Sequence, residues 1–334
     1  MSLKVLYTAA HGGFAGQALP LGGGAAVCEH LVAEWARTKP FDFQLISPAI
    51  LGATAPSGGE LVRFGESDYA RFSRAFERAS TGEILRHDPA ETVVLANDVS
   101  EGPDFETLAR RGYRIFTIYH VDVVGYISAI YLHGWIRPET TVRWYSRVGG
   151  MLPAIARLVW QKQEASVRYS RGVILPSAGM RDVMLRCYPW CPPERIHVLP
   201  WGNWNSGDAG DAASLRREFG VPDEARVLLT LSRISPEKGQ DLLLEELIEG
   251  ERRGEFAERP LWVFVCGESA FMQGARFLDR LKRLAAKLRR VRVVFPGYVT
   301  EDRKRAFFSL ANLFVFPSRT PRNRICSSQA SRCN

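Results

Sequence analysis

Arg233 and Lys238 are two cations whose spacing suits a pyrophosphate. The apolar run Val227–Leu231 precedes them, and Pro236 and Gly239 mark a turn around Lys238. Arginine offers a planar fork of N–H donors and lysine a point charge, so a turn that holds both at the end of a strand could bind a diphosphate. The same pattern is also typical of a solvent-exposed basic turn before a helix, and spacing alone does not decide between the two.

A glycine-rich segment in the first half of the chain is a second candidate. Gly22, Gly23 and Gly24 follow the first apolar run and open a predicted helix. Bare backbone N–H groups at a helix N-terminus attract phosphate or sugar oxygens. The segment is not a dinucleotide fingerprint, because a G-x-G-x-x-G pattern with an acid about 20 residues later is missing. Glycines after a strand also form ordinary turns.

Polar side chains follow two further apolar runs. His120 ends one run and is followed by Asp122, while Asn97 and Asp98 end another. A histidine in this place can hydrogen-bond a sugar hydroxyl or transfer a proton, although many such histidines are only structural. If both runs are strands of one parallel sheet, these four side chains lie at the same edge of the sheet, where the carboxyl ends of the strands meet.

Ten short apolar runs predict the strands that position these residues. They are apolar and β-branched throughout rather than alternating, which is typical of buried parallel strands. Helical stretches lie between them, most clearly Ala25–Ala36 and Arg276–Arg290, so we expect an α/β protein with parallel sheets. The runs are Leu3–Tyr7, Phe43–Ile46, Val93–Ala96, Ile115–Tyr119, Gly172–Leu175, Ile196–Leu199, Val227–Leu231, Leu261–Cys266, Val291–Phe295 and Leu313–Phe316.

The length of 334 residues predicts about two domains. The polar, glycine-rich segment Gly202–Gly210 is the best linker. We therefore expect a first domain over 1–205 and a second over 206–318, the latter with four strands. Residues 319–334 differ from the rest: they hold four Arg and no acid, which is half of the net charge of +8. That charge permits anionic partners, but no motif or dense basic face indicates nucleic-acid binding.

The six cysteines are too scattered for a disulfide framework. Cys187 and Cys191 lack a histidine or second cysteine pair at zinc spacing, so we expect no zinc there. Cys28 and Cys266 have apolar neighbours and are predicted to be small buried side chains. The sequence has no signal peptide and no run of about 18 apolar residues, which predicts a cytoplasmic protein.

The stretch Tyr131–Gly172 is both aromatic and basic, with seven Lys or Arg against two Glu. It could rest peripherally on the anionic inner surface of a membrane, or hold a lipid-linked or polyanionic acceptor. We favour a helix pair with its aromatic side chains in the core and its arginines outside, because no dominant amphipathic face is visible.

Taken together and in order, these pieces resemble a family 4 glycosyltransferase, one of the group 1 retaining enzymes of GT-B fold. The resemblance runs from the N-terminus to Ser318. The segments that carry it are Gly22–Gly24, His120 in an H-x-D sequence, Gly172–Ser177, Ile196–Gly202, Leu231–Arg233 with Pro236–Gly239, Val265–Gly267 and Ala311–Ser318.

The resemblance implies two facing Rossmann-like domains. The first would hold a glycan, lipid or small-molecule acceptor and the second a nucleoside-diphosphate sugar, from which a hexose is transferred with retention of configuration. By resemblance Arg233 and Lys238 neutralise the donor diphosphate, and His120 touches the transferred sugar near its primary hydroxyl, so these three are the expected catalytic residues.

The remaining donor-site residues follow from the same resemblance. Gly22, Gly23 and Gly24 would lie near the donor phosphates, and Gly267 would give the nucleotide close access. Asn97, Asp98 and Asp122 are acceptor-side candidates because of their places after strand ends rather than because of the resemblance. No D-x-D motif occurs, so we expect neither a metal nor another cofactor.

The end of the sequence departs from the family. Beyond Ser318 the family continues with an acid, a glycine-rich turn and a helix that span an E-x7-E carboxylate pair, whereas no acid follows Asp302 here. We therefore expect an aberrant tail from Arg319, produced by a frameshift or truncation, an incomplete donor site and weak activity. The alternative is a non-catalytic, degenerate GT-B protein that retains only acceptor binding in its first domain.

Overall fold

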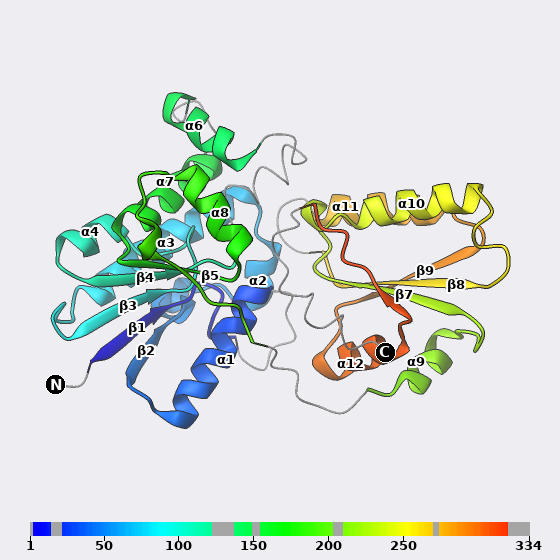
Figure 1. Cartoon of the computed structure of the whole chain (residues 1–334). Helices are drawn as coiled ribbons and strands as arrows, with labels where there is room; N and C mark the ends of the chain where they lie inside the picture. Colours follow the sequence, from blue (N-terminus) through cyan, green and yellow to red (C-terminus); the bar gives the residue numbers. More distant parts are fainter. Residues whose placement is uncertain are drawn as a thin grey trace. The chain divides into compact units, whose positions relative to one another are not determined.

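Ten parallel strands form two separate sheets in the computed structural model, which describes residues 3–14, 22–121, 137–148, 154–202, 210–269 and 274–319. The chain divides into two units, one reaching Trp201 and the other starting at Gly202 (Figure 1). All ten predicted strands are present, most of them within one residue of their expected bounds. The predicted α/β class with parallel sheets is confirmed. The predicted linker lies mostly outside the described residues.

The first unit is a six-stranded parallel sheet in the order β2-β1-β3-β4-β5-β6. Its strands are β1 (Lys4–Thr8), β2 (Asp42–Ile46), β3 (Thr92–Ala96), β4 (Arg114–Ile118), β5 (Gly172–Leu175) and β6 (Ile196–Val198). Its helices are α1 (Gly23–Thr38), α2 (Gly58–Arg63), α3 (Glu66–Ile84), α4 (Phe105–Arg110), α6 (Pro138–Val148), α7 (Ala154–Tyr169) and α8 (Ala178–Cys187), with 3-10 turns at Pro48–Thr54 and Pro193–Arg195.

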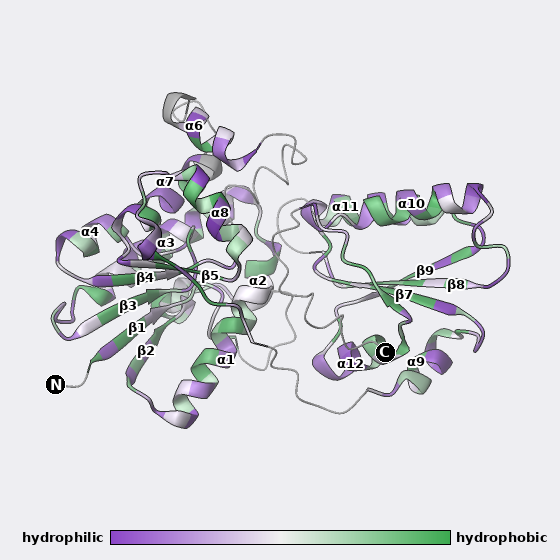
Figure 2. Cartoon of the chain, in the orientation of Figure 1, coloured by the Kyte–Doolittle hydropathy of each residue, from purple (hydrophilic) through white to green (hydrophobic). Residues whose placement is uncertain are grey.

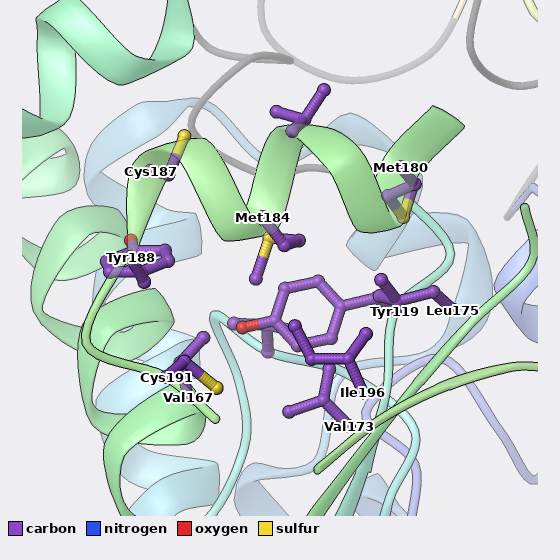
Figure 3. Close-up of a cluster of buried hydrophobic side chains, with 12 residues drawn as sticks. Tyr119, Val167, Val173, Leu175, Met180, Met184, Cys187, Tyr188, Cys191 and Ile196 are labelled. Atoms are coloured by element: carbon purple, nitrogen blue, oxygen red, sulfur yellow. The ribbon is translucent and has the colours of Figure 1, made fainter. Parts of the chain in front are cut away.

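Successive side chains of a strand point to opposite faces of the sheet, so the apolar strands of this first sheet present apolar side chains on both faces. Helices pack on each of these faces. In β5, Ile174 packs with Tyr7 and the α1 side chains, whereas Val173 and Leu175 pack with α8. Figure 3 shows this second cluster, in which Tyr119 lies beneath the methionines of α8. The cluster also takes in Cys187 and Cys191, which form no disulfide and are buried among its apolar side chains.

The second unit is a four-stranded parallel sheet in the order β10-β7-β8-β9. Its strands are β7 (Arg226–Leu231), β8 (Leu261–Cys266), β9 (Val291–Gly297) and β10 (Leu313–Phe314), and its helices are α9 (Ala212–Phe219), α10 (Gln240–Arg252), α11 (Gly274–Ala285) and α12 (Glu301–Leu310). Helices α9 and α12 pack on one face, and α10 and α11 pack on the other. Figure 2 shows apolar residues concentrated on the strands between these two layers. Cys28 and Cys266 are buried, as predicted.

The aromatic and basic stretch contributes one side chain to the core and another to the surface. Trp160 of α7 is 8% exposed and stacks on Tyr145 with ring centroids 5.8 Å apart, whereas Trp144 of α6 is 56% exposed. The helices α6 and α7 therefore agree with the expected helix pair at Trp160 and differ from it at Trp144, which was expected in the core and is exposed. Among the described residues, no helix is both long and apolar enough to cross a membrane.

Arg319 is part of the second unit rather than the start of a tail. Its backbone N–H donates to the carbonyl of Glu237 at 3.0 Å, and its guanidinium donates to the carbonyl of Pro236 at 2.6 Å. The guanidinium also forms a bidentate pair with Asp241, at 2.7 and 2.9 Å, and Asp241 is 1% exposed. The expected boundary between Ser318 and an aberrant tail therefore misplaces this residue. The composition of residues 319–334 suggested a tail that begins at Arg319. Composition does not reveal that Arg319 pairs with Asp241, which lies 78 residues earlier in the chain.

We predict that Arg319→Met destabilises the second unit. Removing one partner of a buried ion pair costs about 3–5 kcal/mol when nothing replaces it. Arg280 lies 3.2 Å from Asp241, so we expect a loss near the lower end. Differential scanning calorimetry of the whole chain measures the change, with Arg283→Met on the exposed side of α11 as the control. Equal unfolding temperatures for the two variants would show that Arg319 contributes nothing to the fold.

Candidate active site

Arg233 and Lys238 flank a buried carboxylate just beyond β7. The Arg233 guanidinium lies 3.2 Å from Glu237, which is 1% exposed and also accepts a hydrogen bond from the Ser235 hydroxyl. Burial raises the pKa of Glu237, but the charges of Arg233 and Lys238 and the Ser235 hydroxyl outweigh burial and lower it below its ordinary value. With Glu237 ionised, the three charged groups together carry one net positive charge.

The turn that carries Lys238 is built against a distant segment of the chain. Pro236–Lys238 form a 3-10 turn, and Gly239 follows with φ of 67°. A Cβ at Gly239 would lie 2.2 Å from the carbonyl oxygen of Pro317, so glycine is required both for conformation and for close packing. The Lys238 ammonium lies 5.6 Å from the centre of the Phe316 ring. The segment 316–319 therefore fixes the position of Lys238.

Two further residues hold the strand end in place. Gln240 is 1% exposed, and its amide donates to the Ser232 hydroxyl at 2.9 Å and to the Arg233 carbonyl at 3.0 Å. Gly267 follows β8 with φ of 137°, and a Cβ there would lie 1.9 Å from the Ser232 carbonyl oxygen. The positive φ and the close approach of the Ser232 carbonyl therefore require glycine at position 267, independently of the nucleotide access that the resemblance leads one to expect.

In the first unit, His120, Asn97 and Gly24 come together beyond the carboxyl ends of β4 and β3. The His120 Nε2 atom lies 3.0 Å from Asn97 Oδ1, and Asn97 Nδ2 donates to the Gly24 carbonyl at 3.3 Å. A Cβ at Gly24 would lie 2.9 Å from the His120 ring, so this position has to be glycine if the ring stays in place. Burial lowers the pKa of His120 to about 4, although the charge of Asp98 opposes the change.

Asn97 is completely buried, which corrects its expected role on the acceptor side. In addition to its bonds to His120 and Gly24, its Oδ1 atom accepts a hydrogen bond of 2.6 Å from the Tyr7 hydroxyl. Both ends of the amide are therefore used within the protein. Sequence reasoning missed Tyr7, which lies inside a strand-like run and carries no signal of a polar role.

Asp98 belongs to a second polar cluster beside this network. Its carboxylate accepts the backbone N–H of Ala10 at 2.8 Å and lies 3.1 Å from His11 Nδ1. Burial raises the pKa of Asp98, but the charge and hydrogen bond of His11 lower it below its ordinary value overall. Glu101, 4% exposed, accepts a hydrogen bond from Tyr69, and burial together with the charge of Asp98 raises its pKa.

The cluster of His11, Asp98 and Glu101 has one possible ligand atom on each residue, and these atoms lie within 4.8 Å of one another. One nitrogen and two oxygens at such distances could hold a divalent cation. The oxygens of Asp98, however, already accept from Ala10 and lie against His11. A cation would therefore have to displace an existing hydrogen bond.

Gly22 and Gly23 lie at the N-terminus of α1, as the sequence predicts. Helix α1 begins at Gly23, and its preceding residue Gly22 has φ of 98° and makes no side-chain cap. The first N–H groups of a helix have no partner within the helix, so this end is suited to an anion or a sugar oxygen. Asp122, the remaining acceptor-side candidate, lies outside the described residues.

Comparison with known proteins finds a family model that matches the second unit. Residues 211–323 match the model of the glycosyl transferases group 1 family. The alpha-D-kanosaminyltransferase of Streptomyces kanamyceticus is 29% identical over 164 residues, which cover 48% of this chain and 39% of that protein. D-inositol 3-phosphate glycosyltransferase 2 of Catenulispora acidiphila is 26% identical over 330 residues, covering 86% of this chain and 75% of its own length.

Among solved structures, the fold resembles that of Anabaena Alr3699/HepE in complex with UDP-glucose. The TM-score is 0.57 at 14% sequence identity, with 96% of this chain and 75% of the other covered. The likeness extends over both units and confirms the predicted GT-B architecture. The chain thus has a GT-B fold, and its residues 211–323 match the model of the glycosyl transferases group 1 family.

Proposed function

We propose that this chain transfers a hexose from a nucleoside-diphosphate sugar to the hydroxyl of a glycan, lipid or small-molecule acceptor, with retention of configuration. The observation that carries the proposal is the pair Arg233 and Lys238 beyond β7, within the segment that matches the family. The relatives are named as glycosyltransferases, and the Anabaena structure holds UDP-glucose. A uridine diphosphate sugar is therefore the first donor to test.

The proposed chemistry needs positive charge where the donor diphosphate leaves. As the bond between the sugar carbon and the phosphate oxygen breaks, its electron pair passes to the diphosphate, and an acceptor hydroxyl bonds to the same carbon and gives its proton to the departing diphosphate oxygen. Arg233 and Lys238 would stabilise the charge that develops on the diphosphate. Their net charge after pairing with Glu237 is supplied by the protein, so we propose that the step needs no metal.

A non-catalytic protein that retains only acceptor binding is the second candidate. The specific observation in its favour is that no acidic residue follows Asp302. Residues 319–334 therefore do not contain the carboxylate pair that the resemblance leads one to expect just after Ser318. This candidate and the first differ in whether the second unit binds a nucleotide.

We predict that one of UDP, GDP and ADP raises the unfolding temperature of the purified chain, and that Arg233→Ala and Lys238→Ala each remove most of the increase. A ligand that binds only the folded state stabilises it in proportion to RT ln(1+[L]/Kd). Loss of one hydrogen bond to a charged group costs about 1.5–3 kcal/mol, or at least a tenfold weaker Kd. Thermal unfolding at several nucleotide concentrations measures both effects.

Two controls make this result specific. Lys282→Ala changes an exposed lysine of α11 and should leave the nucleotide effect unchanged. Arg233→Lys retains the charge without the planar fork and should restore part of the binding. If none of the three nucleotides stabilises the wild-type chain, the second candidate is favoured.

We propose further that the acceptor is not reached through a membrane surface, because Trp160 is used in the core of the first unit. We predict that the chain stays in the supernatant when vesicles of phosphatidylcholine, with or without phosphatidylglycerol, are sedimented. Sedimentation that increases with the anionic lipid and decreases in Trp144→Ser would contradict this prediction and support a peripheral location.

A further inference from the structure

The orientation of the Asn97 amide is determined by its neighbours. The Gly24 carbonyl can only accept a hydrogen bond, so the amide nitrogen of Asn97 must face it. The Tyr7 hydroxyl then donates to Asn97 Oδ1. Burial raises the pKa of Tyr7 far above its usual range, so the phenol retains its proton and remains a donor. Since Asn97 is fully buried, water does not compete for either end of its amide.

This orientation determines where His120 carries its proton. Asn97 Oδ1 is an acceptor only, and His120 Nε2 lies 3.0 Å from it. The hydrogen of a neutral imidazole must therefore be on Nε2, which leaves a lone pair on Nδ1. Nδ1 is buried and has no hydrogen-bond partner in the part of the chain that the structure describes. A buried acceptor of this kind costs free energy until a ligand or water satisfies it.

A donor without a partner lies on the neighbouring ring. Trp201 packs against His120 with ring centroids 5.6 Å apart, and its Nε1 is also a buried polar atom without a partner among the described residues. The imidazole offers an acceptor and the indole offers a donor. A hydroxyl group can satisfy both, because it donates one hydrogen bond and accepts others.

The charged groups around His120 keep it neutral near pH 7. Burial lowers its pKa to about 4; the negative charge of Asp98 favours the protonated ring, whereas the charge of His11 disfavours it. Tyr7 reaches the same Asn97 oxygen as a neutral phenol. A histidine that acts as a general acid or base works best with a pKa near the working pH. His120 is therefore suited to accepting a hydrogen bond rather than to transferring a proton.

We propose that Asn97 is a positioning residue that holds His120 in its Nε2-protonated form, and that Trp201 Nε1 shares with His120 Nδ1 the sugar hydroxyl that the resemblance leads one to expect at this histidine. The hydroxyl part of this proposal rests on the proposed function, whereas the protonation state of His120 does not. Asn97 itself touches no substrate.

Nuclear magnetic resonance of 15N-labelled histidine in the whole chain tests the first part, with His120→Phe used to assign the signal. We expect a neutral ring protonated on Nε2 between pH 5.5 and 8. In Asn97→Asp, a carboxylate replaces the amide and should hold the ring doubly protonated to a higher pH. A wild-type ring protonated on Nδ1, or charged at pH 7, would overturn the proposal, and this readout needs no variant that folds poorly.

Binding measurements test the hydroxyl. His120→Phe should weaken the Kd of a nucleotide sugar about tenfold but should not change that of the corresponding nucleoside diphosphate. The affinity of the wild type for the nucleotide sugar should be constant from pH 5.5 to 8, and in Asn97→Asp it should decrease as the pH falls through this range. If His120→Phe weakens the binding of the nucleotide sugar and of the nucleoside diphosphate equally, the hydroxyl assignment is wrong. The assignment of the protonation state of His120 is then unaffected. If neither ligand binds the wild type, the proposed function fails as well.

Discussion

Desolvation of polar side chains at the ends of parallel strands is the constraint on which both candidate sites depend. A parallel sheet covered by helices on both faces buries its strands, and the residues just beyond them are still partly inside the protein. Asn97 is fully buried and Glu237 is 1% exposed. An unpaired polar group in such a place costs about 1–3 kcal/mol, and an unpaired charge costs more. Each of these side chains must therefore have partners before it can take part in binding.

The two units meet this constraint in different ways. In the first unit the network is neutral: Tyr7, Asn97, Gly24 and His120 exchange hydrogen bonds without a charge among them. In the second unit Glu237 pairs with Arg233, and the backbone around them is held by Gln240. Replacing a neutral partner leaves one hydrogen bond unmade, whereas replacing a charged one leaves a buried charge. We therefore expect the second unit to tolerate substitution less well.

Much of the fold could be predicted from the sequence because buried strands and amphipathic helices are local patterns. The apolar stripe over Arg276–Arg290 predicted α11, and Phe277 and Leu281 are buried as expected. The helix nevertheless ends at Ala285. The Glu251 carboxylate of α10 accepts the backbone N–H groups of residues 289, 290 and 291 at 2.9, 3.1 and 3.3 Å, and a residue 38 positions away is not visible in a local pattern.

The candidate sites show the same limit. Arg233, Lys238 and His120 could be found because their types and their places after apolar runs suggest chemistry. Tyr7 could not, because its partner Asn97 is 90 residues away and its role depends on the pairing of β1 with β3. Asn97 was assigned to the acceptor side from its place at a strand end. The sequence does not show that its amide is used up within the protein.

The contrast between the two units matches two kinds of ligand chemistry, that of a charged diphosphate and that of a neutral sugar hydroxyl. A diphosphate carries charge and changes its charge as the sugar leaves, so cations that keep a net positive charge after pairing suit it. A sugar hydroxyl is neutral, and a charged imidazole would offer it only donors. A buried imidazole with a low pKa remains an acceptor over the physiological pH range. Burial thus has a consequence in each unit. It makes the ionised Glu237 depend on its neighbouring cations, and it keeps His120 neutral.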